Sequence, residues 1–331
     1  MSVYALGSWR AAFLNHKGVA LAVLSAAGFS AKAIFVKLGF RYGASAEALL
    51  ALRMLFALPF FAAMLWLCMR EGALRRIGRR DWQLVVLLGL CGYYLSSLFD
   101  FIGLRYISSA LERLTLFLYP TLVLLLSVIF LGKRYSVCVW LAVALAYLGA
   151  GLALSHDLSD AALGADVWVG VGWVSLSMLC YAVYVAGSGE VVGRVGATPF
   201  SALATLIACF AVLAHFMVTQ PLSALVLPGE VYLITLAMAL FSTVFPVWAL
   251  TQAIRLLGAG RAASISTLGP VLTLSMGWTV LGESFSWTQI AGAALVIAGV
   301  VLVSRSRKAE EAAGPDEVRC PISPRLAPGR S

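Results

Sequence analysis

Residues 118–132 read LYPTLVLLLSVIFLG, and residues 268–282 read LGPVLTLSMGWTVLG. Both stretches are apolar, contain an early proline, and end in Leu-Gly. A shift of 150 residues aligns them, and over the wider ranges 101–154 and 251–304 it makes 12 of 54 positions identical without a gap. Shared apolar composition explains the leucine and alanine matches, but it does not explain why the prolines and glycines align as well. The chain therefore contains an internal repeat.

The composition places the chain in a membrane. Of its 331 residues, 61% are hydrophobic and 12% are charged, whereas soluble domains carry about 25% charged residues. A soluble protein of this size cannot bury so much apolar surface. The formal net charge of +9 does not indicate a nucleic-acid partner, because membrane proteins concentrate Lys and Arg in their cytoplasmic loops. The expected partner is the lipid bilayer, and no nucleic acid is expected.

Ten apolar runs are long enough to cross a bilayer. Because backbone polar groups in lipid must be satisfied within their own segment, these runs predict helices, and they are too long and continuous for barrel strands. The expected fold is an all-α membrane protein with ten transmembrane helices. The predicted spans lie at about residues 18–38, 46–68, 83–103, 108–131, 136–155, 168–189, 198–219, 231–254, 261–281 and 286–304.

The repeat divides these spans into two halves of five. The expected organisation is a cytoplasmic N-terminus at 1–17, a first five-helix repeat at 18–155, a second at 168–304, and a tail at 305–331. The tail is polar and rich in proline, which predicts disorder. Since five is an odd number, the second half enters the membrane from the opposite side, and the repeat is inverted. Inverted repeats recur in secondary transporters, whose substrate site lies between the halves near the midplane.

The distribution of Lys and Arg predicts the orientation. With the N-terminus inside, the inner segments hold 15 of the 24 basic residues, whereas the outer loops hold only Arg41 and Arg105. The acidic Asp157, Asp160 and Asp166 fall on the outer side. Because Lys and Arg mark cytoplasmic loops, both termini are expected in the cytoplasm.

Ionisable residues inside the spans are costly and mark function by default. In the first half they include Lys32, Arg53, Asp100, Glu112 and Arg113. Lys32 lies nearest the middle of its span, where an ammonium can hold a substrate carboxylate or replace a coupling cation. For the other four, two interpretations stay open. In the first, Asp100 or Glu112 neutralises Arg53 and Arg113 and joins the helices; in the second, these groups exchange partners and take up a proton as a gate opens.

Pro120 and Pro270 lie near the midpoints of the fourth and ninth spans. Each is expected to free the carbonyl four residues earlier and to kink its helix. Proline kinks also serve packing alone, but paired interruptions at the midplane indicate a binding site between the halves. The two prolines are therefore predicted hinges.

Polar and aromatic residues in the middle of the spans are candidates to line that site. Aromatic side chains in membrane helices more often face lipid or the core. The mid-helix ones nevertheless favour an amphipathic organic substrate over a bare ion. Together with Lys32, the residues predicted to bind substrate are Tyr93, Phe117, Tyr181, Tyr184, Trp248 and Ser266.

Several short segments resemble a known family. They are Gly103-Leu-Arg-Tyr-Ile-Ser-Ser-Ala110, the breaks Leu118-Tyr-Pro-Thr121 and Leu268-Gly-Pro-Val271, and the helix ends Leu131-Gly132 and Leu281-Gly282-Glu283. In order and spacing they resemble the drug/metabolite transporter superfamily, EamA type, over about residues 18–304. The resemblance implies ten helices in two inverted halves, a bacterial inner membrane, and export of small metabolites such as amino acids or drugs. One departure is Lys133, where the first half would more usually end in Glu, as the second does at Glu283.

Two other functions are alternatives. An intramembrane enzyme would need a catalytic constellation within the spans, but the chain has no HExxH motif and only a lone His215 there. A receptor or scaffold would explain the apolar mass but not the inverted repeat. The scattered histidines and cysteines predict no metal site, and the absence of a phosphate-binding glycine loop predicts no bound nucleotide, so no cofactor is expected. The predicted function is non-enzymatic secondary transport of a small organic metabolite, with the proton as a candidate coupling ion.

Overall fold

The computed structural model describes residues 2–70, 72, 77–131, 135–159, 166–257, 262, 265–284 and 286–313, and in this part it contains helices and turns but no strand. The predicted all-α membrane fold is confirmed. Within the described residues, nine helical stretches are long and apolar enough to cross a bilayer, and a shorter apolar helix at Gly269–Leu281 lies in the ninth predicted span. Position Lys133 and most of the predicted tail, residues 314–331, lie outside the described residues.

The first half runs from α1 to α7. Its elements are α1 (Ser2–Arg41), α2 (Ala46–Arg70), α3 (Arg79–Gly89), the π-helical segment η2 (Leu90–Leu95), α4 (Ser96–Gly103), α5 (Ser109–Phe117), α6 (Tyr119–Leu131) and α7 (Val137–Ser159). The helix α1 begins at Ser2, so the predicted N-terminal segment is largely a continuation of the first span.

The second half runs from α8 to α14. Its elements are α8 (Val167–Val195), α9 (Ala197–Thr219), the short 3-10 helix η4 (Leu222–Leu225), α10 (Gly229–Ala239), the π-helical segment η5 (Leu240–Val244), α11 (Phe245–Leu257), α13 (Gly269–Met276), the π-helical segment η6 (Gly277–Leu281) and α14 (Trp287–Ala313). Because α14 continues to Ala313, the predicted disorder from 305 onward is wrong for its first residues.

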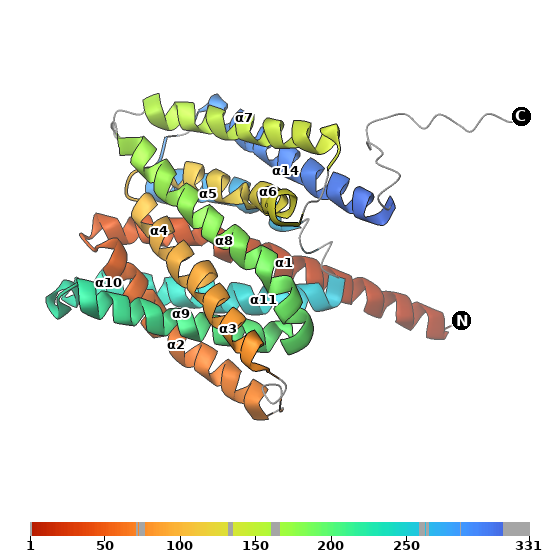
Figure 1. Ribbon diagram of the computed structural model, residues 1–331, viewed down its shortest axis with the longest axis horizontal. Helices are drawn as coiled ribbons and strands as arrows, with labels where there is room; N and C mark the ends of the chain where they lie inside the picture. Colours follow the sequence, from red (N-terminus) through yellow and green to blue (C-terminus); the bar gives the residue numbers. More distant parts are fainter. Residues whose placement is uncertain are drawn as a thin grey trace, which may run out of the picture.

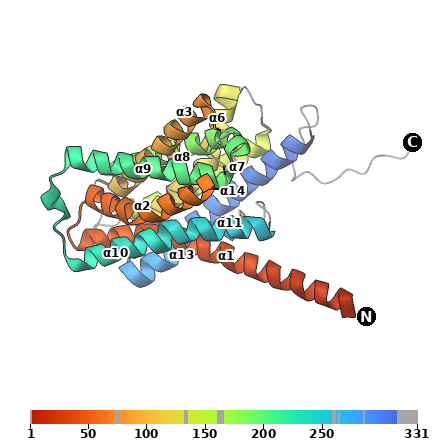
Figure 2. The ribbon, with the colours of Figure 1, turned by 90° about the horizontal axis from the view of Figure 1, so that it is seen from below.

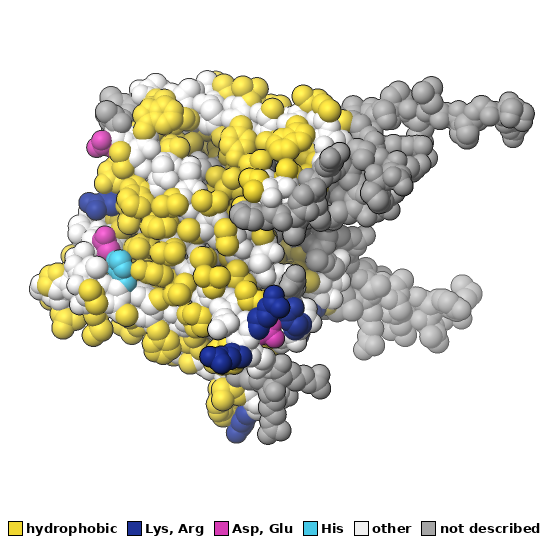
Figure 3. Space-filling model, viewed as in Figure 1, with side chains coloured by type: hydrophobic (Ala, Val, Ile, Leu, Met, Phe, Trp, Pro, Cys, Tyr) yellow, Lys and Arg dark blue, Asp and Glu magenta, His cyan; other side chains and the backbone are white. Residues whose placement is uncertain are grey.

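The helices form a bundle whose two ends differ. The start of α1 and the end of α14 lie at one end, which we call the termini end (right in Figure 1). The turn between α1 and α2 lies at the other, which we call the α1–α2 end. Apolar side chains cover the middle of the face in Figure 3, whereas Lys and Arg gather mainly toward the termini end. This distribution is that of a membrane protein with a basic end.

In each half, the first helix packs against helices of the other half. The helix α1 packs against α11 and α13 of the second half, and α8 packs against α4, η2 and α5 of the first half. These two sets of contacts correspond to one another under the repeat. Equivalent helices also pair directly, α2 with α9 and α7 with α14 (Figure 1), and α2 lies between α9 and α10 (Figure 2). Each half therefore completes its packing only in the presence of the other.

One pair of hydrogen bonds makes this correspondence explicit. Ser25 Oγ on α1 donates to the carbonyl of Pro246, 2.9 Å away, just after η5. Ser177 Oγ on α8 donates to the carbonyl of Ser96, 2.7 Å away, just after η2. The π-helical segments η2 and η5 begin 150 residues apart, at Leu90 and Leu240. A π-helical turn is rare and often marks a functional site, and here each one contacts the first helix of the opposite half.

Small residues let α7 and α14 approach closely. A Cβ atom on Gly149 would lie 2.5 Å from the carbonyl oxygen of Gly292, and one on Gly299 would lie 2.6 Å from the backbone N of Ala146. Membrane helices associate through such small-residue contacts because the hydrophobic effect gives no attraction between helices in lipid. The alignment of Gly149 with Gly299 in the repeat thus has a packing explanation.

The predicted hinges have a different form from the one expected. Pro120 and Pro270 do not kink continuous helices. The helix α5 ends at Phe117 and α6 starts at Tyr119, while α13 starts at Gly269, so each proline lies in the first turn of a new helix. A proline there forfeits nothing, because the first N–H groups of a helix have no intrahelical partner. Both spans are therefore interrupted rather than bent.

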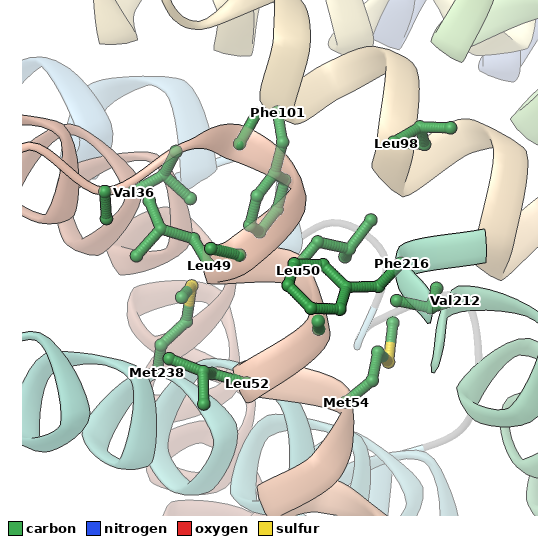
Figure 4. Packing of buried hydrophobic residues seen from close by; sticks show 14 of the residues in the cluster. Val36, Leu49, Leu50, Leu52, Met54, Leu98, Phe101, Val212, Phe216 and Met238 are labelled. Atoms are coloured by element: carbon green, nitrogen blue, oxygen red, sulfur yellow. The ribbon is translucent and has the colours of Figure 1, made fainter. Parts of the chain in front are cut away.

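The largest apolar cluster fixes α2 against its neighbours. Leu49, Leu50 and Met54 of α2 are buried among residues of α1, α4, α9 and α10 (Figure 4). The neighbours labelled in Figure 4 include Val36, Phe101, Val212, Phe216 and Met238. This packing holds the part of α2 that carries Arg53 in a defined position.

Candidate functional site

Three of the predicted charged residues form one cluster. Lys32 Nζ on α1 lies 2.5 Å from Asp100 Oδ2 on α4 and 3.1 Å from Glu112 Oε1 on α5. Asp100 is 2% exposed and Glu112 is fully buried. We expected these carboxylates to pair with Arg53 and Arg113, and the structure differs, because the ammonium of Lys32 reaches both. We call these three residues the Lys32 cluster.

The elements around the cluster explain its position. Glu112 lies in the first turn of α5, where the helix dipole stabilises negative charge, and Ser108 caps that helix by accepting a hydrogen bond from the Leu111 N–H. Asp100 follows η2 on α4. Asp100 Oδ1 and Glu112 Oε2 are buried and have no hydrogen-bond partner among the described residues. Either of these two oxygens can therefore accept a proton.

Arg53 lies between the halves. Its Nε donates to Thr243 Oγ1 in η5 at 3.0 Å, and its guanidinium lies 5.4 Å from the ring centroid of Phe101. The residue is 6% exposed, and its Nη1 has no hydrogen-bond partner among the described residues. Arg53 is therefore a buried cation held mainly by one hydroxyl and one aromatic face.

Arg113 lies against the break in the ninth span. A Cβ atom on Gly269 would lie 2.6 Å from Arg113 Nη2, so the guanidinium lies directly against this glycine. The Gly269 carbonyl accepts a hydrogen bond from Ser30 Oγ at 2.9 Å. Arg113 Nε is buried and has no hydrogen-bond partner among the described residues. The guanidinium thus lies at the break in the opposite half.

Four tyrosines lie side by side near these charges, and we call them the tyrosine cluster. The hydroxyls of Tyr93 and Tyr184 are 3.3 Å apart. The ring of Tyr181 lies 5.8 Å from that of Tyr184 and 5.0 Å from that of Tyr119, measured between centroids. The helix α5, which carries Arg113, packs against α8, which carries Tyr181 and Tyr184. Three predicted substrate-binding residues are therefore brought together, and Tyr119 joins them.

The remaining predicted residues are not all part of this group. Phe117, the last residue of α5, is half-buried and packs in the apolar cluster around Leu114 and Leu118. Ser266 Oγ donates to the Ala262 carbonyl at 3.1 Å. Trp248 is 53% exposed and contacts the ring of Phe245. The structure thus does not place Trp248 with the tyrosines.

A second polar group closes the α1–α2 end. Glu283 Oε1 lies 3.3 Å from Lys37 Nζ on α1, and Glu283 Oε2 accepts from Ser109 Oγ on α5 at 2.6 Å. The Ser109 N–H also donates to this carboxylate at 3.2 Å. Arg41 Nη2 donates to the Leu281 carbonyl. The sequence placed Glu283 only in the helix-end motif Leu281-Gly282-Glu283. The recurrence of Leu-Gly at Leu131-Gly132 was the signal that could have indicated a role for this helix end.

Asp157 belongs to the same end. The expected loop position of this residue is wrong, because it lies in the last turns of α7 and is fully buried. Its Oδ2 accepts from the Ser108 N–H at 2.8 Å, and its Oδ1 accepts from Ser108 Oγ at 2.9 Å and from Gln289 Nε2 at 3.2 Å. Two carboxylates therefore bind successive N–H groups at the start of α5.

A cleft of about 400 Å³ lies at the termini end. Its walls come from the end of α2, the junction between α8 and α9, and the end of α11. Met64, Leu67 and Pro199 contribute apolar surface, and Arg255 is the one charged residue among the described residues of the lining. The molecule is thus tied by polar contacts at the α1–α2 end and hollowed at the termini end.

The sequence matches the model of a known family twice. The two matches to the EamA-like transporter family cover residues 16–155 and 168–305. The chain is 30% identical over 270 residues to YcbK of Bacillus subtilis, described as an uncharacterized transporter, covering 80% of this chain and 85% of that one. An uncharacterized transporter of Archaeoglobus fulgidus is 27% identical over 235 residues, covering 70% and 81%.

The fold is also similar to a solved structure described only as "Crystal structure of protein". The TM-score is 0.55 at 18% sequence identity, and the likeness covers 89% of this chain and 98% of that chain. At this identity the likeness shows the fold alone.

Proposed function

The chain belongs to the EamA-like transporter family, and on this premise we propose that it exports a small organic metabolite from a bacterial cell by alternating access. The membrane is the inner membrane, both termini lie in the cytoplasm, and the two repeats are residues 18–155 and 168–304. The observation that carries the mechanism is the Lys32 cluster, because its one ammonium and two carboxylates come from differently packed helices.

The cluster lies across a boundary between two groups of helices. The helix α1, which carries Lys32, packs mainly against α11 and α13, whereas α4, which carries Asp100, packs mainly against α8; α5, which carries Glu112, packs against both α8 and α13. Inverted-repeat carriers work by movement of one packed group against the other. Such a movement would separate Lys32 from Asp100 and so break up the Lys32 cluster. The bonds across this boundary are therefore the ones that must break during transport.

Breaking these bonds supplies the coupling step. A buried carboxylate that loses its cation is strongly destabilised, and uptake of a proton relieves that cost. Asp100 Oδ1 and Glu112 Oε2 have no other partner among the described residues, so either oxygen can receive the proton. Proton entry would then accompany substrate exit, and the return of Lys32 would expel the proton on the cytoplasmic side.

The polar contacts of Glu283 act as the outer gate in this scheme. The Lys and Arg distribution assigns the α1–α2 end to the outside, so the described form is closed outward. Ser109 and Glu283 belong to opposite halves and must separate when this gate opens. The helix breaks before Pro120 and Pro270 let the two halves of their spans tilt independently.

The substrate site is proposed between these gates. The tyrosine cluster offers flat apolar faces and hydroxyls in one place, with Phe117 and Ser266 at the neighbouring helix breaks. Such a surface suits an amphipathic organic molecule. Trp248 is left out of the proposed site because of its exposed position.

Counterflow into proteoliposomes tests the proposal. Purified protein is reconstituted with a pool of unlabelled amino acids and related metabolites inside and labelled tracers outside, with and without a pH gradient. We expect tracer accumulation that the gradient alters. Glu112→Gln should remove the pH dependence, and Glu230→Gln, which changes an exposed acid at the start of α10, is the matched control. If no tracer of a broad pool enters, the carrier proposal is refuted.

The alternatives have less support. The curated relatives are described as transporters, which argues against an intramembrane enzyme. A receptor or scaffold does not require ionisable groups that bind across moving helices, and pH dependence lost in Glu112→Gln would separate a carrier from both.

A further inference from the structure

The buried and partly buried charges in the middle of the bundle do not balance. The described cations there are Lys32, Arg53 and Arg113, and the described anions are Asp100 and Glu112. Both carboxylates are bound by Lys32, so neither arginine has an ion-pair partner among the described residues. An uncompensated charge within a membrane protein is costly and functional by default. The middle of the bundle therefore has a surplus of one positive charge.

The carboxylates at the α1–α2 end do not remove this surplus. Glu283 is paired with Lys37 and also accepts from Ser109. Asp157 accepts from Ser108 and Gln289, and it binds at the positive end of the α5 dipole. Both carboxylates are therefore already bound by local partners at the α1–α2 end. The surplus stays with the two arginines.

Of these two arginines, Arg113 is the better placed to meet a ligand. Arg53 is 6% exposed and held by Thr243 and the face of Phe101. Arg113 is only half-buried, its Nε has no hydrogen-bond partner among the described residues, and it lies beside Gly269; its helix α5 packs against α8, the helix of Tyr181 and Tyr184. A guanidinium in this position presents a planar fork that matches an acid group.

The cleft at the termini end also carries positive charge. Arg255 is the one charged residue among its described lining residues, and a cleft lined by one sign of charge concentrates ligands of the opposite sign. This observation is independent of the charges in the middle, since Arg255 belongs to the end of α11. The cleft and the surroundings of Arg113 therefore both favour a negative group.

We infer that the transported molecule is a small organic anion with an aromatic or apolar part, and that Arg113 binds its acid group while the tyrosine cluster binds the rest. The inference rests on the proposed transport function. Lys32 is thereby assigned to coupling, because its ammonium is already bound by two carboxylates.

Counterflow with three separate pools tests the charge of the substrate. Proteoliposomes are loaded with organic acids (benzoate, phenylacetate, phenyl phosphate), with amines (phenethylamine, putrescine) or with zwitterionic amino acids, and labelled tracers of the same class are added outside. We expect exchange in the acid pool and none in the amine pool; the phosphate and carboxylate tracers separate the two kinds of acid group. Exchange confined to amines or zwitterions would overturn the inference while leaving transport intact. No exchange in any pool would instead refute the transport function.

Variants of Arg113 test the assigned residue. Arg113→Gln should lower acid exchange about ten-fold or more, because truncating a buried charge partner is costly, and Arg113→Lys should restore part of it. Arg105→Gln, which changes an exposed arginine before α5, is the control. Unchanged acid exchange in Arg113→Gln would exclude this residue from binding. Should the variant fail to fold, as judged by size-exclusion chromatography, the selectivity of the wild-type protein among the pools decides the inference.

Discussion

The hydroxyl of Ser109 at the start of α5 donates to Glu283 Oε2 at 2.6 Å, which joins the fourth span to the end of the ninth. The same carboxylate binds the Ser109 N–H and Lys37. One side chain thus connects three helices from both halves, at the end where the proposed gate must open.

Removing this carboxylate charge should loosen the start of α5. In Glu283→Gln, the pair with Lys37 is lost and the bond from Ser109 becomes weaker, since charge-assisted hydrogen bonds are about twice as strong as neutral ones. We expect faster amide hydrogen exchange in peptides that contain Ser109, measured by mass spectrometry. Glu230→Gln, an exposed acid of α10, should leave that exchange unchanged. Equal protection in both variants would contradict a gate at Glu283.

Asp157 should contribute to stability rather than to selectivity. Its two oxygens accept three hydrogen bonds from Ser108 and Gln289 in a fully buried position. In Asp157→Asn, an NH2 group replaces one of the two oxygens, so a buried N–H donor faces a donor of Ser108 or Gln289. The cost of one unsatisfied buried group is about 1–3 kcal/mol. The measurement is the thermal unfolding midpoint in detergent, which should fall. Asp166→Asn, at an exposed site, should not move it, and equal midpoints for the two variants would argue against the buried network.

The contact between α7 and α14 should tolerate no added side chain at Gly149. A Cβ there would lie 2.5 Å from a backbone oxygen, whereas a Cβ on Gly151, on the same helix, meets nothing within 4 Å. Gly149→Leu should therefore cost about 1–3 kcal/mol or more through overpacking, and Gly151→Leu should cost nothing comparable. Yield and monodispersity on size exclusion measure the difference. A well-behaved Gly149→Leu protein would show that the two helices can separate freely.

The paired hydroxyls of Tyr93 and Tyr184 should affect substrate affinity more than folding. Tyr93→Phe keeps the ring and removes a hydroxyl whose partner lies 3.3 Å away. In the proposed site this hydroxyl is available to the substrate, and the loss of one hydrogen bond is worth about 1 kcal/mol, so we expect KM for counterflow to rise a few-fold at unchanged expression. Tyr42→Phe, at the exposed turn between α1 and α2, is the control. An identical KM in both variants would place the tyrosine cluster outside the binding site.

Much of this fold could be predicted because membrane insertion leaves few alternatives. Long apolar runs in lipid must be helices, and the aligned prolines and glycines revealed the two halves. The structure gave those residues different reasons, since Gly149 serves packing and Pro120 begins a new helix. A repeat shows that two positions are equivalent, but it does not show which structural contact requires the same residue at both.

The site could be predicted only in part. The residues of the Lys32 cluster were predicted because charges inside spans are conspicuous, but their pairing was not, because it depends on which helices face each other in three dimensions. Asp157 was misplaced for a related reason. Its hydropathy is that of a loop residue, and only the backbone N–H groups at the start of α5 make a buried position favourable. Sequence patterns report where a charge lies along a helix and not what compensates it.

The wide π-helical turns of η2 and η5 also decide which way the residues beyond them face. Each adds a residue to its turn, and removing one residue rotates everything beyond it by about 100° around the helix axis. Asp100, which lies beyond η2, would then face away from Lys32. The turns begin at Leu90 and Leu240, at equivalent places in the two halves.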